Sequence, residues 1–197
     1  PTPPPTATPS PTPQSPAATP AQTAPTATPI RTLPPMPIVF QSDRDGDNEV
    51  FTIRSDGTGL AQLTQNKHVD KVPGWSPDGS RLVFRSERDG NSELYTMNAD
   101  GSEQRRLTSI PYLQQYRAHW SPDGNHISFY SAGRVAGDES TLNVITPDGS
   151  RQRLIDDAYG GFFSHNPWSP DGTRLAFMKL ADTFELWIAD LDSGSTV

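Results

Sequence analysis

Hydrophobic and polar residues alternate in short runs through residues 38–197, and turn residues separate these runs at regular intervals. Residues 81–85 (RLVFR) and 93–97 (ELYTM) are typical, being rich in the β-branched and aromatic side chains that favour strands. Gly, Asp and Pro lie between the runs, where chain reversal is expected. Because no stretch has a sustained helical period, the pattern predicts short antiparallel strands throughout this part of the chain.

The same arrangement of runs and turns repeats with a period near 45 residues. A Trp followed by Ser-Pro-Asp-Gly recurs at 75–79, 120–124 and 168–172, so these tryptophans are spaced by 45 and 48 positions. An Asp-Gly pair closes a later run at 56–57, 100–101 and 148–149. An aromatic residue ends the corresponding run in all four units, at Phe40, Phe84, Phe129 and Phe177. In the last three units this run follows the Trp motif. Four short strands in each period of this length predict one blade of a β-propeller.

The turn residues agree with this prediction. Ser-Pro-Asp-Gly suits a type I turn, because Pro presets φ at the second position and Gly occupies the last. The Asp-Gly pairs suit hairpins that need a positive φ. The Trp before each Ser-Pro-Asp-Gly turn is large enough to fill the space between blades, so we expect Trp75, Trp120 and Trp168 to be packing residues.

These motifs resemble the TolB-type, WD-like β-propeller family, and the resemblance covers residues 38–197. It rests on the three Trp-Ser-Pro-Asp-Gly segments, on 42–46 (SDRDG), and on 49–51 (EVF) and 93–95 (ELY). The resemblance implies an all-β propeller with blades at 38–64, 70–108, 116–154 and 164–197. It implies less about function, because the family includes translocation accessories, scaffolds and the non-catalytic propellers of peptidases.

The first and last units are incomplete, so about three and a half blades are expected. The first unit lacks its Trp-containing strand, and the fourth is predicted to stop before its last strand. The third replaces the Asp-Gly hairpin with a longer loop from Ala132 to Ser140. Three closures remain open: about two further blades in a longer chain, a four-bladed ring, or pairing of the open edges with another chain. The first is favoured. The chain begins with Pro rather than Met, and we interpret it as processed or truncated.

Residues 1–37 differ from the rest, with 14 of the 21 prolines and the single charge of Arg31. Proline favours polyproline II, so an extended stalk or linker of about 110 Å is expected from its rise of about 3.1 Å per residue. Threonine beside proline outside the cell is often O-glycosylated, although an unmodified spacer is an equal alternative. The candidate glycosylation sites are Thr2, Thr6, Thr8, Thr12, Thr19, Thr23, Thr26 and Thr28.

Charge and composition exclude several classes of partner. Removing Arg31 from the net charge of −7 leaves −8 on the repeat region, which argues against nucleic acid and against an anionic membrane surface. The absence of Cys excludes disulfides, thiolate metal sites and a thiol nucleophile in this sequence. No apolar run approaches the 18 residues of a membrane span, so no membrane insertion by this chain is expected.

Motifs for catalysis are missing from the sequence. It has no Gly-x-Ser-x-Gly elbow, no His-Glu-x-x-His and no phosphate or dinucleotide loop, so we predict no catalytic residues, no cofactor and no metal. The acidic stretch 43–49 resembles a calcium loop, but its Gly lies at the fourth position instead of the sixth, and we interpret it as a hairpin turn.

Polar residues before two of the tryptophans are the candidate binding site. They are expected to lie at the mouth of a central channel, either as ligand-binding groups or as solvated channel residues. By strand alternation, Arg117 and His119 should face one side of their strand while Trp120 faces the other. The complete candidate set is Arg117, His119, His165 and Asn166.

Together these features predict a non-enzymatic propeller that binds or displays proteins at the cell surface, outside the cell or in the periplasm. An alternative is a structural subunit of an extracellular filament, joined to copies of itself through its stalk and open sheet edges. A second alternative is a propeller accessory to a peptidase-like enzyme. The expected partners are therefore another protein or further copies of the chain, with glycans on the tail as candidates.

Overall fold

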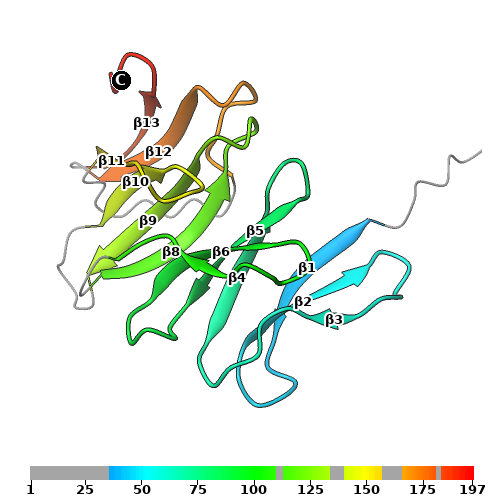
Figure 1. Cartoon of the computed structure of the whole chain (residues 1–197). Helices are drawn as coiled ribbons and strands as arrows, with labels where there is room; N and C mark the ends of the chain where they lie inside the picture. Colours follow the sequence, from blue (N-terminus) through cyan, green and yellow to red (C-terminus); the bar gives the residue numbers. More distant parts are fainter. Residues whose placement is uncertain (1–35, 110–112, 134–139, 157–165, 181–182) are drawn as a thin grey trace, which may run out of the picture. The chain divides into compact units, whose positions relative to one another are not determined.

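The computed structural model describes residues 36–109, 113–133, 140–156, 166–180 and 183–197, which form four antiparallel sheets in chain order (Figure 1). The first sheet contains β1 (Pro37–Ser42), β2 (Glu49–Arg54) and β3 (Ala61–Gln62). The second contains β4 (Asp70–Trp75), β5 (Arg81–Ser86), β6 (Glu93–Asn98) and β7 (Arg105–Arg106). The third contains β8 (Leu113–Trp120), β9 (Ile127–Gly133), β10 (Thr141–Ile145) and β11 (Gln152–Asp156). The fourth contains β12 (Arg174–Leu180) and β13 (Phe184–Asp190).

Within each sheet, every strand pairs with its neighbours along the chain, as in the blades of a propeller. The predicted all-β fold is therefore confirmed. Among the described residues, the first sheet consists of three strands and begins at β1. The predicted stalk lies outside the described residues except for Met36 and Pro37, so its glycosylation sites do too. No helix among the described residues has the length and apolarity needed to cross a membrane.

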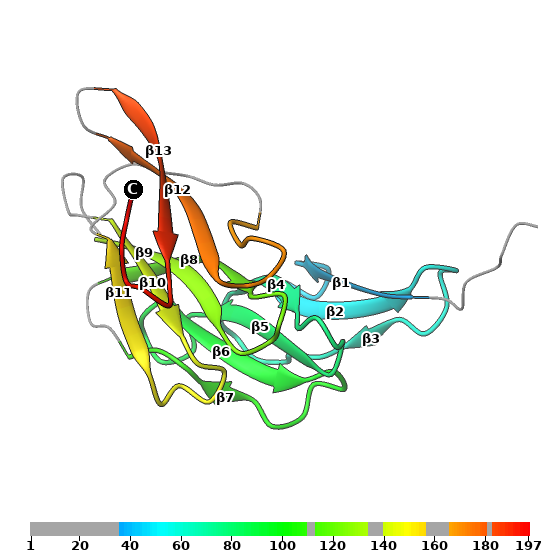
Figure 2. The ribbon, with the colours of Figure 1, turned by 90° about the horizontal axis from the view of Figure 1, so that it is seen from above.

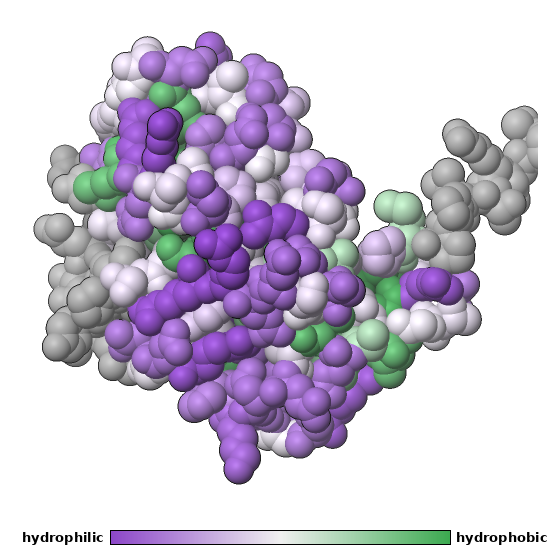
Figure 3. All heavy atoms as spheres, in the orientation of Figure 1, coloured by the Kyte–Doolittle hydropathy of each residue, from purple (hydrophilic) through white to green (hydrophobic). Residues whose placement is uncertain are grey.

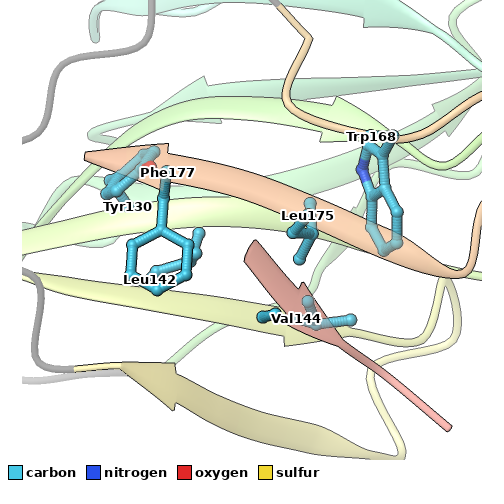
Figure 4. Packing of buried hydrophobic residues seen from close by; sticks show 7 residues of the cluster. Tyr130, Leu142, Val144, Trp168, Leu175 and Phe177 are labelled. Atoms are coloured by element: carbon cyan, nitrogen blue, oxygen red, sulfur yellow. The ribbon is translucent and has the colours of Figure 1, made fainter. Parts of the chain in front are cut away.

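In the second and third sheets, strand alternation turns one face toward the preceding sheet and the other toward the following sheet (Figure 2). In β5, Leu82 and Phe84 pack toward the first sheet, whereas Val83 packs toward the third. One cluster of buried side chains fills each space between successive sheets. Figure 4 shows the last of these, in which Leu142 and Val144 of the third sheet meet Leu175 and Phe177 of the fourth, among others.

The repeated aromatic residues occupy these clusters, as predicted for the tryptophans. Trp120 and Trp168 are buried, and the partly buried Trp75 packs against the cluster between the first two sheets. Phe84, Phe129 and Phe177 are fully buried. Packing between sheets is therefore the structural role of the repeated Trp and Phe.

A short stretch of backbone pairing follows β13 in the fourth sheet. Ala189 of β13 bridges to Thr196, and the backbone N–H of Val197 donates to the carbonyl of Ile188 at 3.0 Å. The backbone N–H of Ile188 donates in return to the carbonyl of Val197 at 2.7 Å. Among the described residues, only an isolated bridge and its hydrogen bonds follow β13, so the fourth unit ends before a complete last strand, as expected. The polar run after Asp190 carries no strand-like alternation that would have indicated this pairing.

The Ser-Pro-Asp-Gly turns are organised by their own side chains. The Gly79 N–H donates to the Ser76 carbonyl at 2.9 Å, and Gly79 adopts a φ of 70°. The Ser76 hydroxyl donates to Asp78 Oδ1 at 2.6 Å, and the Ser80 N–H donates to the same oxygen at 3.0 Å. The same backbone bond closes the turns at Gly124 and Gly172. These contacts span only a few residues, which explains why the motif specifies its turn without tertiary help.

Two buried glutamates anchor strands β2 and β6 of the first two sheets. Glu93, at the start of β6, is fully buried and accepts a hydrogen bond of 2.6 Å from the Thr108 hydroxyl. That hydroxyl in turn accepts one of 3.0 Å from the Leu94 N–H. Glu49 and Thr64 form the same arrangement in the first sheet. Burial raises the pKa of Glu49 against the opposing effect of the Thr64 hydroxyl. These carboxylates are therefore structural groups, a role that the Leu-Thr pairs at 63–64 and 107–108 only hint at.

Candidate functional site

The inner strands β4 and β8 each contain a bulge. Pairing shifts register between Lys71 and Gly74 in β4 and between Tyr116 and His119 in β8. At these bulges Val72 and Arg117 adopt φ values of 53° and 48°, in the left-handed region that costs a residue with a side chain about 1–2 kcal/mol. Backbone strain of this kind is often found at functional sites, which makes the inner strands the place to look for one.

Local sequence explains one of the two bulges. Pro73 has no N–H, so it cannot contribute a hydrogen bond to the ladder with β5. The Val72 N–H, beside the bulge, instead donates to Gln41 Oε1 of the first sheet at 2.8 Å. Nothing comparable in the sequence explains the bulge at Arg117.

A hollow of about 360 Å³ lies between the inner ends of the second, third and fourth sheets. Its walls include His119 and Asn166, two of the four predicted site residues. Arg117 is exposed on the same strand but is not part of the lining, and His165 lies outside the described residues. The lining consists of Gly74, Trp75, Pro77, Ala118, His119, Trp120, Pro122 and Asn166.

The predicted alternation along β8 can be compared with the burial of its side chains. Ala118 and Trp120 are buried in the cluster toward the second sheet, whereas Arg117 is exposed and His119 is half-buried. Two hydrogen bonds between side chains and backbone link Trp168 to these residues. The Trp168 Nε1–H donates to the His119 carbonyl at 3.1 Å, and the Trp168 backbone N–H donates to Asn166 Oδ1 at 3.2 Å. His119 and Asn166 are thus brought together although they are 47 positions apart in the sequence.

The two tryptophans of the hollow are lining residues that the sequence analysis assigned to packing alone. The indole Nε1 atoms of Trp75 and Trp120 are buried and have no hydrogen-bond partner among the described residues. Buried indole N–H groups normally have an acceptor. Because both Nε1 atoms are buried, the hollow offers a ligand the apolar surface of two indoles beside the polar side chains of His119 and Asn166.

A second hollow of about 430 Å³ adjoins the first and shares Pro77, Trp120 and Pro122 with it. Its rim includes Asp78 and Asp123 of two Ser-Pro-Asp-Gly turns. Hydrogen bonds from Ser76 and then Ser80 lower the pKa of Asp78 to about 2. Burial opposes the same effect at Asp123, where hydrogen bonds from Ser121 and Asn125 nevertheless hold the pKa below its usual range. Both carboxylates are thus ionised at neutral pH.

Metal and acid–base chemistry find little support in the described ranges. The stretch 43–49 connects β1 to β2 with Ser42 paired opposite Glu49, so its interpretation as a hairpin turn is confirmed. Its Asp45 accepts a hydrogen bond of 2.6 Å from Gln62 Nε2, and Glu49 is bound by Thr64 and Asn66. Within these ranges, no three or more His, Cys, Asp or Glu residues gather in a geometry that could hold a metal ion.

Comparison with known proteins points to one family. Protein TolB homolog from Chlorobium luteolum is 42% identical over 166 residues, covering 81% of this chain and 35% of that protein. The putative TolB structure from Agrobacterium tumefaciens superposes with a TM-score of 0.63 at 26% identity, covering 82% of this chain and 60% of that one. TolB from Acinetobacter baumannii gives 0.64 at 17% identity, covering 81% and 39%.

The chain therefore spans about a third of the length of the curated relative that it matches. Residues 35–136, just over half of the chain, match the family described as TolB beta propeller domain. The chain belongs to this family of TolB-type β-propellers.

Proposed function

We propose that this chain is a non-catalytic protein-binding propeller segment that binds its partner at the paired tryptophans of the inner hollow. The observation that carries the proposal is the hollow of about 360 Å³, which Trp75 and Trp120 line together with His119 and Asn166. Tryptophan is enriched among residues that dominate protein interfaces, because it offers a large apolar area. A peptide with an apolar side chain is the ligand that such a site would take.

The proposed setting is extracellular, at the cell surface or periplasmic, with residues 1–37 as a stalk. Support comes from the Pro/Thr composition of this segment and from membership of the TolB-type family. Mass spectrometry of the native protein tests the glycosylation of the eight candidate threonines. A mass equal to that of the bare polypeptide would contradict it.

A selection from a library of random peptides tests the binding site. Peptides that bind the chain should lose at least about tenfold in affinity on Asn166→Ala or His119→Ala, as expected when a hot-spot contact is removed. The exposed Gln152 on β11 provides a control, and Gln152→Ala should leave affinity unchanged. If every selected peptide binds the Asn166 and His119 variants as tightly as the parent, the hollow is not the binding site.

A structural subunit is the second candidate, favoured by the apolar surface of β13. Phe184, Leu186 and Ile188 are 59%, 65% and 39% exposed. They lie on the face of β13 whose equivalent in the third sheet packs against the following sheet. Hydrophobic surface gathers over the fourth sheet and over the first (green in Figure 3), and such patches commonly mark contact sites. Sedimentation of the chain should then show self-association that Leu186→Ser reduces. A monomer at high concentration would contradict this candidate.

A further inference from the structure

A third hollow of about 450 Å³, which we call the outer hollow, adjoins the two already described. It shares Arg81, Gly124 and Pro147 with the second hollow, and most of its remaining lining comes from the turn between β10 and β11. The inner hollow beside Trp75 and Trp120 is thus connected to the outer hollow through the second one. These hollows lie over the turns of the second and third sheets, each of which has four strands among the described residues.

Two arginines line the outer hollow from different sheets. Arg81 begins β5, and its Nη2 donates to the hydroxyl oxygen of the buried Thr96 at 2.9 Å, which holds the guanidinium in place. Arg151 directly precedes β11 and is exposed. Neither arginine forms a salt bridge within the part of the chain that the structure describes. The outer hollow therefore presents two guanidinium groups with donors left for a ligand.

The fourth sheet shows what the repeat can provide for the first of these arginines. Arg174 is equivalent to Arg81, because the backbone N–H of each donates at 2.9 Å to the serine hydroxyl of its own Ser-Pro-Asp-Gly turn. Nε of Arg174 lies 3.4 Å from Oδ2 of Asp190, the residue that pairs opposite it on β13. The residue opposite Arg81 on β6 is Asn98, which is uncharged. The same arginine is thus paired with a carboxylate in the fourth sheet and not in the second.

The second arginine also departs from the repeat. Arg151 follows Asp-Gly-Ser at 148–150, and the residue that follows the same three residues in the second sheet is Glu103. The charge at this position is therefore opposite in the two sheets. Residues that build the fold recur from unit to unit, as the tryptophans and turn glycines do, so a pair of arginines at one place indicates a role in binding.

Three aspartates near these arginines are already bound by their own turns. Asp148 lines the outer hollow, and Asp78 and Asp123 line the second. Oδ1 of Asp148 accepts hydrogen bonds from the Thr146 hydroxyl at 2.6 Å and from the Ser150 N–H at 3.0 Å, and these bonds lower its pKa to about 2. The ionised aspartates repel a run of acidic residues. The surface therefore suits a single carboxylate placed at the two arginines.

We propose that the peptide bound in the inner hollow extends outward over these turns and carries an acidic residue that Arg81 and Arg151 bind. This inference rests on the proposed function, because it concerns the same bound peptide. Guanidinium groups bind carboxylates through short, charge-assisted hydrogen bonds whose geometry is specific. The apolar residue in the inner hollow supplies buried area, and the acidic residue in the outer hollow fixes the direction in which the peptide lies.

Selection from two peptide libraries tests this extension. One library contains all amino acids, and the other lacks Asp and Glu and ends in an amide, so that it offers no carboxylate. The best peptides of the first library should carry an Asp or Glu at a constant spacing from an apolar residue. Fluorescence anisotropy should show that they bind the chain at least about tenfold more tightly than the best peptides of the second, as expected for a charge-assisted hydrogen bond.

Substitutions on both sides of the contact test the groups involved. Arg151→Gln in the protein, or replacement of the acidic peptide residue by its amide, should each weaken binding about tenfold. The two changes together should weaken it little further, since either one already removes the pair. Arg81→Gln should act in the same way, and added salt should weaken binding to the parent chain more than binding to either variant.

Arg105→Gln is the matched control. Arg105 is an exposed arginine on β7 that forms no salt bridge within the described ranges and lies outside the lining of the outer hollow. Its substitution should leave affinity within about twofold. Because Arg81 is half-buried and bound to Thr96, circular dichroism checks that Arg81→Gln is folded, and the exposed Arg151 tests the contact independently.

The outcomes separate this inference from the proposed function. Peptides that lose affinity on Asn166→Ala or His119→Ala, but bind Arg81→Gln and Arg151→Gln as tightly as the parent, would overturn the acidic contact and leave the inner hollow as the binding site. Peptides that depend on the arginines alone would overturn both, because the two hollows would then not share one ligand. Failure of both libraries to yield a binder would also count against both.

Discussion

The third and fourth sheets carry the same repeat, yet one is covered on both faces and the other on one. Leu142 of β10 is fully buried, whereas Leu186 at the equivalent position of β13 is 65% exposed. Val144 and Ile188 differ in the same way, at 4% and 39%. The strand sequence is similar in both places, so the neighbouring sheet decides whether a given side chain becomes core. Each repeat of the sequence forms one sheet, but that sheet buries its apolar faces only when neighbouring sheets pack against it.

The largest effect is expected at the repeated packing phenylalanine of an interior sheet. Phe129→Ala should lower the free energy of unfolding by about 4 kcal/mol, because a fully buried ring leaves a cavity between two sheets. Phe40 of the first sheet is only half-buried, and Phe40→Ala should cost about half as much. Urea unfolding of both variants measures the difference. Equal losses would mean that the first sheet is covered in solution.

Leu142 and Leu186, at equivalent positions of β10 and β13, should differ strongly in how much their truncation lowers the stability of the chain. Leu142→Ala should destabilise the chain by about 3 kcal/mol, within the usual range for buried leucine. Leu186→Ala should cost less than about 0.5 kcal/mol, as surface substitutions do. Thermal unfolding monitored by circular dichroism tests both. A large loss at Leu186 would show that another molecule packs on β13.

The Asp-Gly turns extend the comparison to the backbone. Gly57 and Gly101 have φ values of 83° and 85°, so alanine is strained at either by about 1–2 kcal/mol. A Cβ on Gly101 would lie 2.9 Å from the carbonyl oxygen of Leu63 in the first sheet, whereas one on Gly57 meets nothing within 4 Å. Gly101→Ala should therefore be more destabilising than Gly57→Ala by about 1 kcal/mol. Equal urea midpoints would place the sheets further apart than described.

The smallest effect is expected from the aspartates of the Ser-Pro-Asp-Gly turns, and it should be the same in the second and the fourth unit. Hydrogen bonds from Ser76 and Ser169 lower the pKa values of Asp78 and Asp171 to about 2, below the value of about 3.9 expected after unfolding. Their contribution is therefore complete above about pH 4 and is lost as the pH falls toward 2. Asp78→Asn and Asp171→Asn should each flatten the fall in Tm between pH 4 and 2, by similar amounts. A larger change at Asp78 would mean that the turn depends on its neighbouring sheets.

Sequence and structure agree best where contacts are local or strictly periodic. The Ser-Pro-Asp-Gly turns, the strands and the packing of Trp120 and Trp168 all followed from the repeat. The candidate site was predictable only in part, because His119 and Asn166 belong to different sheets and meet across a packed interface. That Trp75 and Trp120 line this hollow was hidden by their assignment to the core.

The sequence by itself determined the repeat, its strands and its turns, since each is encoded by residues only a few positions apart. Tertiary structure decided which repeated side chains are core and which are surface, because burial depends on the sheet packed alongside. It also decided that Thr196 and Val197 pair beside β13. The physical reason is the same in each case: a face or an edge of a sheet acquires its role from the strand that lies against it.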